Sequence, residues 1–325
     1  MLAAIWWAWA AYAWLTNEVD GERRGVRLAI VGAMIAMLLA SLAIPGAFEQ
    51  DALLFALAYL GVRVMHVVLF AAGTEHVDVR VAAAALAPTA VLAPALLIVA
   101  SGFDGVAQTL IWIAALAVDY IGGALRGIGG WRLSPGHFAE RHGLIVIIAL
   151  GESIVAIGVG AEGIALHAGE LAAAALGVIV SAALWWIYFD PALDRVEEAL
   201  EHAAPGRERN VMARDAFSFL HLPLVAGIVL LALGVKKTLG HVDKQLDDIA
   251  AVALCGGVAL YLACDVAFRA RCLGTADGRR LLAAGVCALA VLPALVLPAL
   301  AALAIVAAIG AALVAAESFA PRGTT

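Results

Sequence analysis

The segment HFAERHGLIVIIALGESIVAIGVG, His137 to Gly160, decides the fold, because it is long and apolar enough to cross a bilayer as one helix. Comparable apolar runs of about 17–22 residues recur along the whole chain. Of the 325 residues, 64% are hydrophobic and only 14% are charged. The longest polar connection, roughly 190–215, is shorter than the ~50 residues that a separate soluble domain needs. The sequence therefore predicts an all-α, polytopic transmembrane helical bundle, with one membrane domain covering 1–325.

About eleven membrane spans are expected, with boundaries placed to within ~2–4 residues. Their predicted positions are 1–16, 26–44, 52–72, 79–100, 106–122, 142–160, 171–189, 216–235, 249–268, 281–296 and 298–316.

Positive charge predicts how these spans are oriented. Sixteen of the twenty Lys and Arg residues lie in alternate connections and the tail, three lie in 236–247, and the last, Arg63, lies inside a span. Because cytoplasmic loops carry the excess of Lys and Arg, the side with sixteen is predicted to be cytoplasmic, in an inner membrane. Met1 then lies outside, without a charged n-region or a cleavage site, which disfavours a signal peptide. The connections predicted to be cytoplasmic are 17–27, 73–80, 123–141, 190–215 and 269–280, with the tail.

An internal match suggests a repeat. FALAYLGVRV, ending at Val64, aligns with VALYLACDVA, ending at Ala267, so that Tyr59 falls on Tyr261 and Arg63 on Asp265. The matched spans are six apart, an even number, so the halves 1–122 and 123–325 would be parallel six-helix repeats. A first helix would then be missing before Met1, and a complete chain would have twelve spans. The alternative is that the match reflects only the alanine-rich composition.

Ionisable residues inside the spans are the candidate functional residues. Glu152 lies ten residues, about 15 Å, beyond His142, which is half of a ~30 Å hydrocarbon core. Arg63 lies at a similar depth, His66 follows one turn later, and Asp119 is nearer the cytoplasm. Intramembrane charges usually face a bundle interior or a water-filled cavity. These four residues are therefore expected to line a solute or proton path, and the alternative is a structural ion pair that fixes helix register.

Within this cluster, Glu152 and Arg63 are predicted to be partners, because an unpaired arginine in hydrocarbon is costly and both residues reach the same depth. Asp119 is the next candidate for the arginine's partner. His66 or His221, the latter near the cytoplasmic side, would relay protons. Glu152 would be the carboxylate that couples an ion to transport.

The cytoplasmic end of the 142–160 span holds a second set of polar residues. A Ser-Pro pair at 134–135 predicts the helix start. The residues that follow would form either a gate for the substrate or an ordinary interfacial charged turn: His137, Glu140, Arg141 and His142. Asp265, near the same interface, is expected to bind water or Arg269, one turn on.

Other functions find little support in the residues. The net charge of −6 and the lack of a long basic run argue against nucleic-acid binding. The four cysteines show no CxxC pair or metal-type spacing, so neither a metal nor another cofactor is expected. No GxSxG, P-loop, HExxH or GxGxxG pattern occurs in a usable context, and Ser153 has no histidine nearby in sequence. We expect no enzyme activity.

Three segments carry a family resemblance. HFAERHGLIVIIALGESIVAIG, LWWIYFD (184–190) and FLHLPLVAGIVLLALG (219–234) resemble segments of the bacterial low temperature requirement A (LtrA) family, over nearly the whole chain. The family's usual opening helix, of the type ELFFDLVFV, is absent. The resemblance implies an inner-membrane protein associated by name with growth in the cold, and it implies no particular reaction. Its motifs single out His137, Glu140, Arg141, His142, Gly151, Glu152, Ser153, Asp190, His221 and Pro223.

Two main functional hypotheses follow, and a membrane-embedded enzyme is the third. The first is a secondary transporter or ion-coupled permease for an unknown small solute or ion, which uses the intramembrane Glu/Arg/His cluster. The second is a non-transporting membrane protein that supports envelope adaptation to cold, in which the same charges lock the helices together. In both, the lipid bilayer is the expected partner.

Overall fold

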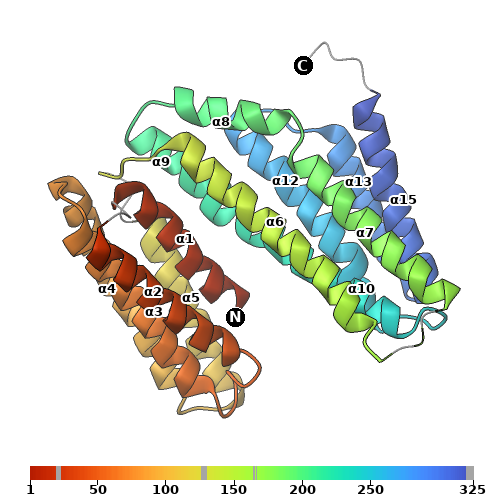
Figure 1. Ribbon diagram of the computed structural model, residues 1–325, viewed down its shortest axis with the longest axis horizontal. Coiled ribbons are helices and arrows are strands. Elements are labelled where there is room, and N and C mark those ends of the chain that lie inside the picture. Colours follow the sequence, from red (N-terminus) through yellow and green to blue (C-terminus); the bar gives the residue numbers. More distant parts are fainter. Residues whose placement is uncertain (20–22, 126–129, 164, 166, 320–325) are drawn as a thin grey trace. The chain divides into compact units, whose positions relative to one another are not determined.

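The fold is described from a computed structural model, which describes residues 1–19, 23–125, 130–163, 165 and 167–319. The chain divides into two compact units (Figure 1). Unit 1 comprises Met1–Phe138 and Ala203–Ala213, and unit 2 comprises Ala139–His202 and Arg214–Thr325. Each unit is a bundle of helices, and the described residues form no strand.

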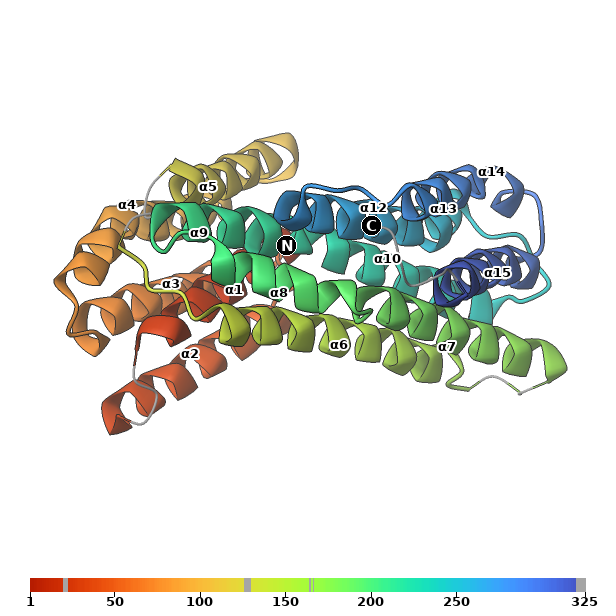
Figure 2. The ribbon, with the colours of Figure 1, turned by 90° about the horizontal axis from the view of Figure 1, so that it is seen from above.

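Unit 1 is built around α3, which packs between α2 and α4 (Figure 2), while α4 also packs on α5 and α1 contacts both α3 and α5. Aromatic rings fill its core: the ring centroids of Phe55 and Trp112 are 5.2 Å apart. The close packing holds α1, α3 and α5 against one another. The helices of this unit are α1 (Leu2–Glu18), α2 (Arg24–Leu42), α3 (Ala52–Gly73), α4 (Val77–Ala100), α5 (Gly105–Leu125) and α9 (Arg207–Ala213).

Unit 2 is built around α12, which packs on α10 and α13, while α15 packs on α7. Gly227 and Gly257 allow α10 and α12 to touch through their backbones, since a Cβ on Gly227 would lie 2.6 Å from the carbonyl oxygen of Gly257. Its helices are α6 (Pro135–Gly160), which begins in unit 1, α7 (Ala168–Tyr188), α8 (Ala192–His202), α10 (His221–Gly240), α11 (Asp248–Ala251), α12 (Gly257–Leu273), α13 (Gly278–Leu289), α14 (Val291–Ala294) and α15 (Ala299–Ser318), with the π-helical turns η1 (Arg214–Phe219) and η2 (Val252–Gly256).

The outer faces of the helices are apolar, as a bilayer requires. On α2, for example, Leu28, Met34 and Leu42 are each about two-thirds exposed. Nine stretches of helix in the described part of the chain are long and apolar enough to cross a membrane. The prediction of an all-α, polytopic transmembrane bundle is confirmed.

Two of the eleven expected spans are not among the nine stretches of helix that are long and apolar enough to cross a membrane in the described residues. The first, 1–16, is α1, a helix of 17 residues. The span expected at 281–296 is divided between α13, which has 12 residues, and the short α14. Pro293 explains the break, because it has no N–H to bond the carbonyl of Leu289, the residue at which α13 ends.

Candidate functional site

The buried charges of unit 1 lie between α3 and α5. Arg63 donates from Nη2 to Oδ1 of Asp119 at 2.8 Å. Tyr59 donates its hydroxyl to the other oxygen, Oδ2, also at 2.8 Å. Tyr59 and Arg63 are four residues apart, so one face of α3 presents both to the same carboxylate. All three residues are at least 95% buried.

The arginine of this pair is only partly satisfied. Nε and Nη1 of Arg63 are buried and have no hydrogen-bond partner within the described residues. An unsatisfied buried donor is unfavourable by about 1–3 kcal/mol, and by more when it is charged. Native proteins bury few such groups, so this one requires an explanation.

His66, one turn further along α3, is also partly satisfied. Its Nε2 lies 3.0 Å from the carbonyl oxygen of Ala11 on α1, while its Nδ1 is buried with no hydrogen-bond partner among the described residues. Because a carbonyl only accepts, Nε2 carries the proton, and in the neutral ring Nδ1 is an acceptor. Tyr12 of α1 packs on this ring and donates its hydroxyl to the carbonyl of Val62 at 3.0 Å. Donors and an acceptor without partners therefore lie on one face of α3.

Within unit 1 the partner of Arg63 is Asp119, the next candidate predicted from the sequence, while the predicted pairing of Arg63 with Glu152 would join the two units and stays a prediction. Glu152 lies on α6 in unit 2, where its side chain is exposed, while the next residue, Ser153, is buried. Depth along a span does not fix the direction in which a side chain points. A long arginine side chain also reaches a carboxylate several ångströms away in depth, so equal depth was not required.

Unit 2 holds a larger ionic network, at the end where α7 and α15 finish and α13 begins. Asp265 on α12 receives Arg269 Nε at 3.1 Å and Arg280 Nη1 at 2.5 Å. Asp190, just beyond α7, receives Arg269 Nη1 at 2.7 Å and Arg280 Nη2 at 2.5 Å. Glu317 on α15 receives Arg280 Nε at 2.8 Å. The network ties four helices together.

Every guanidinium nitrogen in this network has an acceptor. Nη2 of Arg269 donates to the carbonyls of Ile187 and Tyr188, at 2.8 and 2.9 Å. Nη1 of Arg280 also reaches the Ile187 carbonyl, at 3.2 Å. Since these carbonyls lie in the last turn of α7, the arginines also cap that helix. The network is therefore complete without any further group.

The sequence predicted part of this network. The expected contact of Asp265 with Arg269 is confirmed. Asp190 was expected at the cytoplasmic end, and the structure places it at the centre of the network. Arg280 and Glu317 were missed, because each lies one residue outside a predicted span. Their position at the same end of neighbouring spans was the signal that could have found them.

His221 joins a second buried cluster in unit 2. Its Nε2 lies 2.8 Å from the Tyr188 hydroxyl and its Nδ1 lies 2.9 Å from the carbonyl of Ala216. The π-helical turn η1, which ends just before His221, contains that carbonyl. The ring of His142 is 5.3 Å from that of His221 between centroids. The structure thus brings His142 and His221 together in unit 2, whereas His66 and Asp119 belong to unit 1.

The other residues of the predicted cytoplasmic motif lie nearer the surface. His137 and Glu140 are exposed and Arg141 is half-buried, so only His142 of this set reaches the interior. A gate formed by all four side chains therefore lacks support, while the charged-turn alternative fits the three outer residues.

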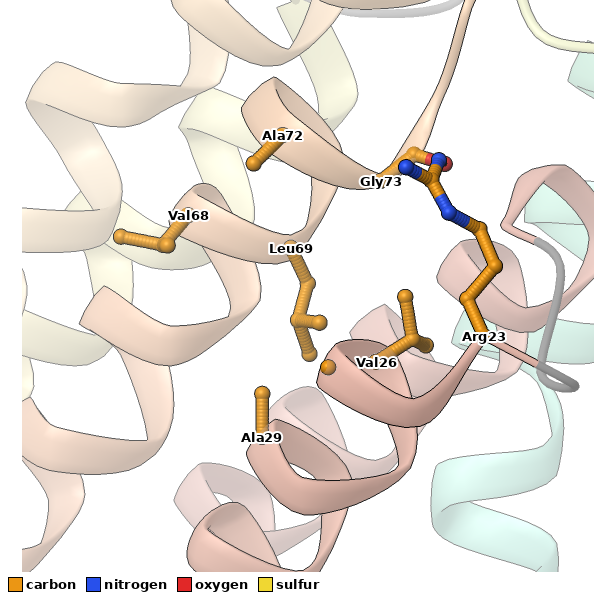
Figure 3. A pocket seen from close by; sticks show the side chains of 8 residues that line it. Arg23, Val26, Ala29, Val68, Leu69, Ala72 and Gly73 are labelled. Carbon is orange, nitrogen blue, oxygen red and sulfur yellow. The ribbon is translucent and has the colours of Figure 1, made fainter.

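A groove of about 310 Å³ lies between α2 and α3, next to the start of α2 (Figure 3). Its walls are aliphatic, and its one charged side chain, Arg23, extends toward the carbonyl of Gly73 rather than over the apolar floor. The groove therefore offers little to bind a polar solute. The described residues also contain no group of three or more His, Cys, Asp or Glu that could hold a metal ion.

Comparisons with known proteins agree with the resemblance noted above. The chain is 30% identical over 276 residues to an uncharacterized protein, RA0937, of Rhizobium meliloti (strain 1021), and the match covers 80% of this chain. The chain spans 66% of the length of that relative. No solved structure matches. The sequence model of the family described as "Bacterial low temperature requirement A protein (LtrA)" matches residues 1–315. The chain, a multi-pass membrane protein, belongs to the LtrA family.

Proposed function

We propose that this protein is a secondary transporter or ion-coupled permease of the bacterial inner membrane, and that it catalyses no chemical reaction. The observation that carries the proposal is Arg63, a buried arginine in mid-span whose Nε and Nη1 have no partner among the described residues. In a purely structural ion pair, every donor of the arginine is expected to have an acceptor, since each buried N–H without a hydrogen-bond partner destabilises the fold. Unused donors favour a site that takes a ligand.

The geometry supports the following roles for the residues. Asp119 takes the place first given to Glu152, as the carboxylate that neutralises Arg63 and can accept a proton. Tyr59 holds Asp119 in position through its hydroxyl bond. His66 lies one turn away and, as a histidine, is suited to relay a proton.

Glu152 keeps a separate role in this proposal. Its side chain is exposed on α6, inside a span. A carboxylate facing lipid at that depth is unfavourable by about 2.5–3.5 kcal/mol on the insertion scale. This cost favours a polar environment for Glu152, such as the wall of an aqueous path.

A second candidate function is structural support of the envelope in the cold, without transport. The observation that favours it is the network of unit 2, in which every guanidinium nitrogen of Arg269 and Arg280 has an acceptor. Buried charge in this chain therefore also serves as a cross-link between helices.

Transport by the purified protein in liposomes separates the two functions. With a trapped pH indicator, a transporter should move protons when a gradient of its solute is imposed, and Asp119→Asn and Glu152→Gln should each reduce that flux. Asp104→Asn makes the same chemical change at an exposed position between α4 and α5, and it should leave the flux unchanged. Absence of flux across a broad panel of ions and small solutes would favour the structural function.

A further inference from the structure

The donors of Arg63 that have no partner indicate the chemistry of the ligand. Nε carries one N–H and Nη1 carries two, and a guanidinium presents them in a plane. A planar oxyanion can accept two bonds at once, one from Nε or Nη1 and one from the second hydrogen of the Nη2 group between them, whereas a halide offers a single point of contact and a cation is repelled. The geometry of the donors therefore favours an anion with at least two oxygens in one plane.

The surroundings of Arg63 limit the charge that this anion can carry. Beside the arginine lie the carboxylate of Asp119, the hydroxyls of Tyr59 and Tyr12, and the neutral ring of His66. On the same helix as Asp119, the hydroxyl of Tyr120 is donated to the carbonyl of Ala3 on α1. The neighbouring helices add no Asp, Glu, Lys, Arg or His within residues 2–16 of α1, 28–42 of α2 and 81–100 of α4.

With Arg63 positive and Asp119 negative, the site is neutral. A monovalent anion would make it −1, which is strongly unfavourable in a low-dielectric interior. One proton taken up by Asp119 restores neutrality, and the anion then replaces the carboxylate as the counter-charge of Arg63. A divalent anion would still leave one uncompensated charge.

We propose that the Arg63 site of unit 1 binds a small monovalent oxyanion of the carboxylate type, and that Asp119 takes up one proton from solution when the anion binds. The inference rests on the proposed transport function and names its substrate class. Anion and proton would then cross the membrane together, with no net charge moved by the site. No covalent bond forms or breaks, and the only group that changes protonation is the Asp119 carboxyl.

Binding to the purified full chain in detergent tests the inference directly. Nitrate and lactate are suitable probes, because each presents at least two oxygens in one plane and both stay fully ionised between about pH 6 and 8, at least about two units above a carboxyl's ordinary pKa. Each anion should raise the midpoint of thermal unfolding. Because one proton is taken up per anion bound, the apparent affinity for the anion should weaken about tenfold for each unit by which the pH is raised. Chloride and sulfate should stabilise the protein less.

Proton uptake is measured in the same system. Addition of lactate to the weakly buffered protein should raise the pH of the solution, by up to one proton per anion bound. Anion binding without proton uptake would overturn the coupling to Asp119. This measurement needs no variant, so it holds even if substitutions at the site impair folding.

Two variants separate the roles of the partners. Asp119→Asn imitates the protonated carboxyl, so lactate should still bind, without proton uptake and without pH dependence. Arg63→Lys keeps the charge but loses the planar fork, so affinity should fall at least about tenfold, the loss expected for one charged hydrogen bond. Arg27→Lys, at an exposed position on α2, is the control and should bind as the unaltered protein does.

Unchanged stability in nitrate and lactate would overturn the inference, and so would full binding by Arg63→Lys. The first result would mean that water satisfies the arginine, and the second that the anion binds without the planar donors of the guanidinium. Proton-coupled flux of a cation or a neutral solute in liposomes would then leave the transport function standing, so the two failures are distinguishable.

Discussion

Unit 1 and unit 2 each bury charge in an apolar bundle, but they satisfy it differently. In unit 1, Arg63 has one carboxylate partner, and its Nε and Nη1 have none among the described residues. In unit 2, Arg269 and Arg280 use all of their nitrogens on three carboxylates and two carbonyls. Burial is therefore similar in the two units, whereas hydrogen bonding is complete in only one.

This difference separates a cross-link from a candidate binding site. A complete network gains nothing from a ligand, because every donor already has an acceptor. A partly satisfied arginine is unfavourable until something occupies its donors, so selection retains it only where the occupant matters. The comparison supports a structural role for unit 2's charges and the ligand-binding role that we propose for Arg63.

The largest expected effect comes from breaking the network of unit 2. Arg280→Ala leaves the three carboxylates of the network, Asp265, Asp190 and Glu317, with Arg269 as their single arginine. Breaking a buried ion pair typically destabilises a protein by ~3–5 kcal/mol, so we expect about 5 kcal/mol of destabilisation for this variant. Thermal unfolding and folded yield in detergent measure it. Arg279→Ala, at the adjacent exposed position, is the matched control and should change little. Equal stability of the two variants would contradict the structural role of the network.

A smaller effect is expected from breaking the pair of unit 1. Arg63→Ala should destabilise the protein by about 3 kcal/mol, the lower end of the range for a broken buried pair, because Asp119 can lose its charge by protonation. Arg63→Met together with Asp119→Leu should recover most of that loss, since an apolar replacement leaves no buried charge. Denaturation of the single and double variants measures the coupling, and strictly additive losses would mean that the two charges act independently.

The tyrosines at the aligned positions give a finer comparison. Tyr59 donates to a carboxylate and Tyr261 donates to the carbonyl of Leu184, both at 2.8 Å. A bond to a charged group contributes about 1.5–3 kcal/mol and a neutral one about 0.5–1.5 kcal/mol. Tyr59→Phe should therefore destabilise the protein more than Tyr261→Phe, as measured by the shift in thermal midpoint. The reverse order would show that Asp119 is not charged in the folded protein.

Single-cysteine substitutions for labelling are expected to change stability least, and the labelling reports directly on the topology. In a chain whose native cysteines are replaced, a cysteine at His202 should react with a membrane-impermeant reagent only after the cells are opened, because 190–215 is predicted to be cytoplasmic. A cysteine at Asp243, in the connection of the opposite side, should react in intact cells. Both side chains are exposed, so access to the reagent is matched. Labelling of His202→Cys in intact cells would place the network of unit 2 at the outer end.

The sequence by itself determined the fold class and most of the spans. Runs of apolar residues as long as the hydrocarbon core is thick leave few alternatives to transmembrane helices, since backbone groups in lipid must bond within their own segment. The i, i+4 contact of Asp265 with Arg269 was predictable for a related reason, because helical periodicity fixes which neighbours share a face. The break at Pro293 was missed in the sequence, although proline lacks the N–H that a continuous span needs.

Only the tertiary structure decided which charges meet. Depth can be counted along a span, but the rotation of each helix and the choice of its neighbours depend on packing between segments far apart in sequence. That is why Arg63 was assigned to Glu152, while α5 supplies Asp119 as its partner. It is also why the network of Asp190, Asp265 and Arg280 became visible only once α7, α12 and α13 were packed together, since no local pattern records contacts across 15 to 90 residues.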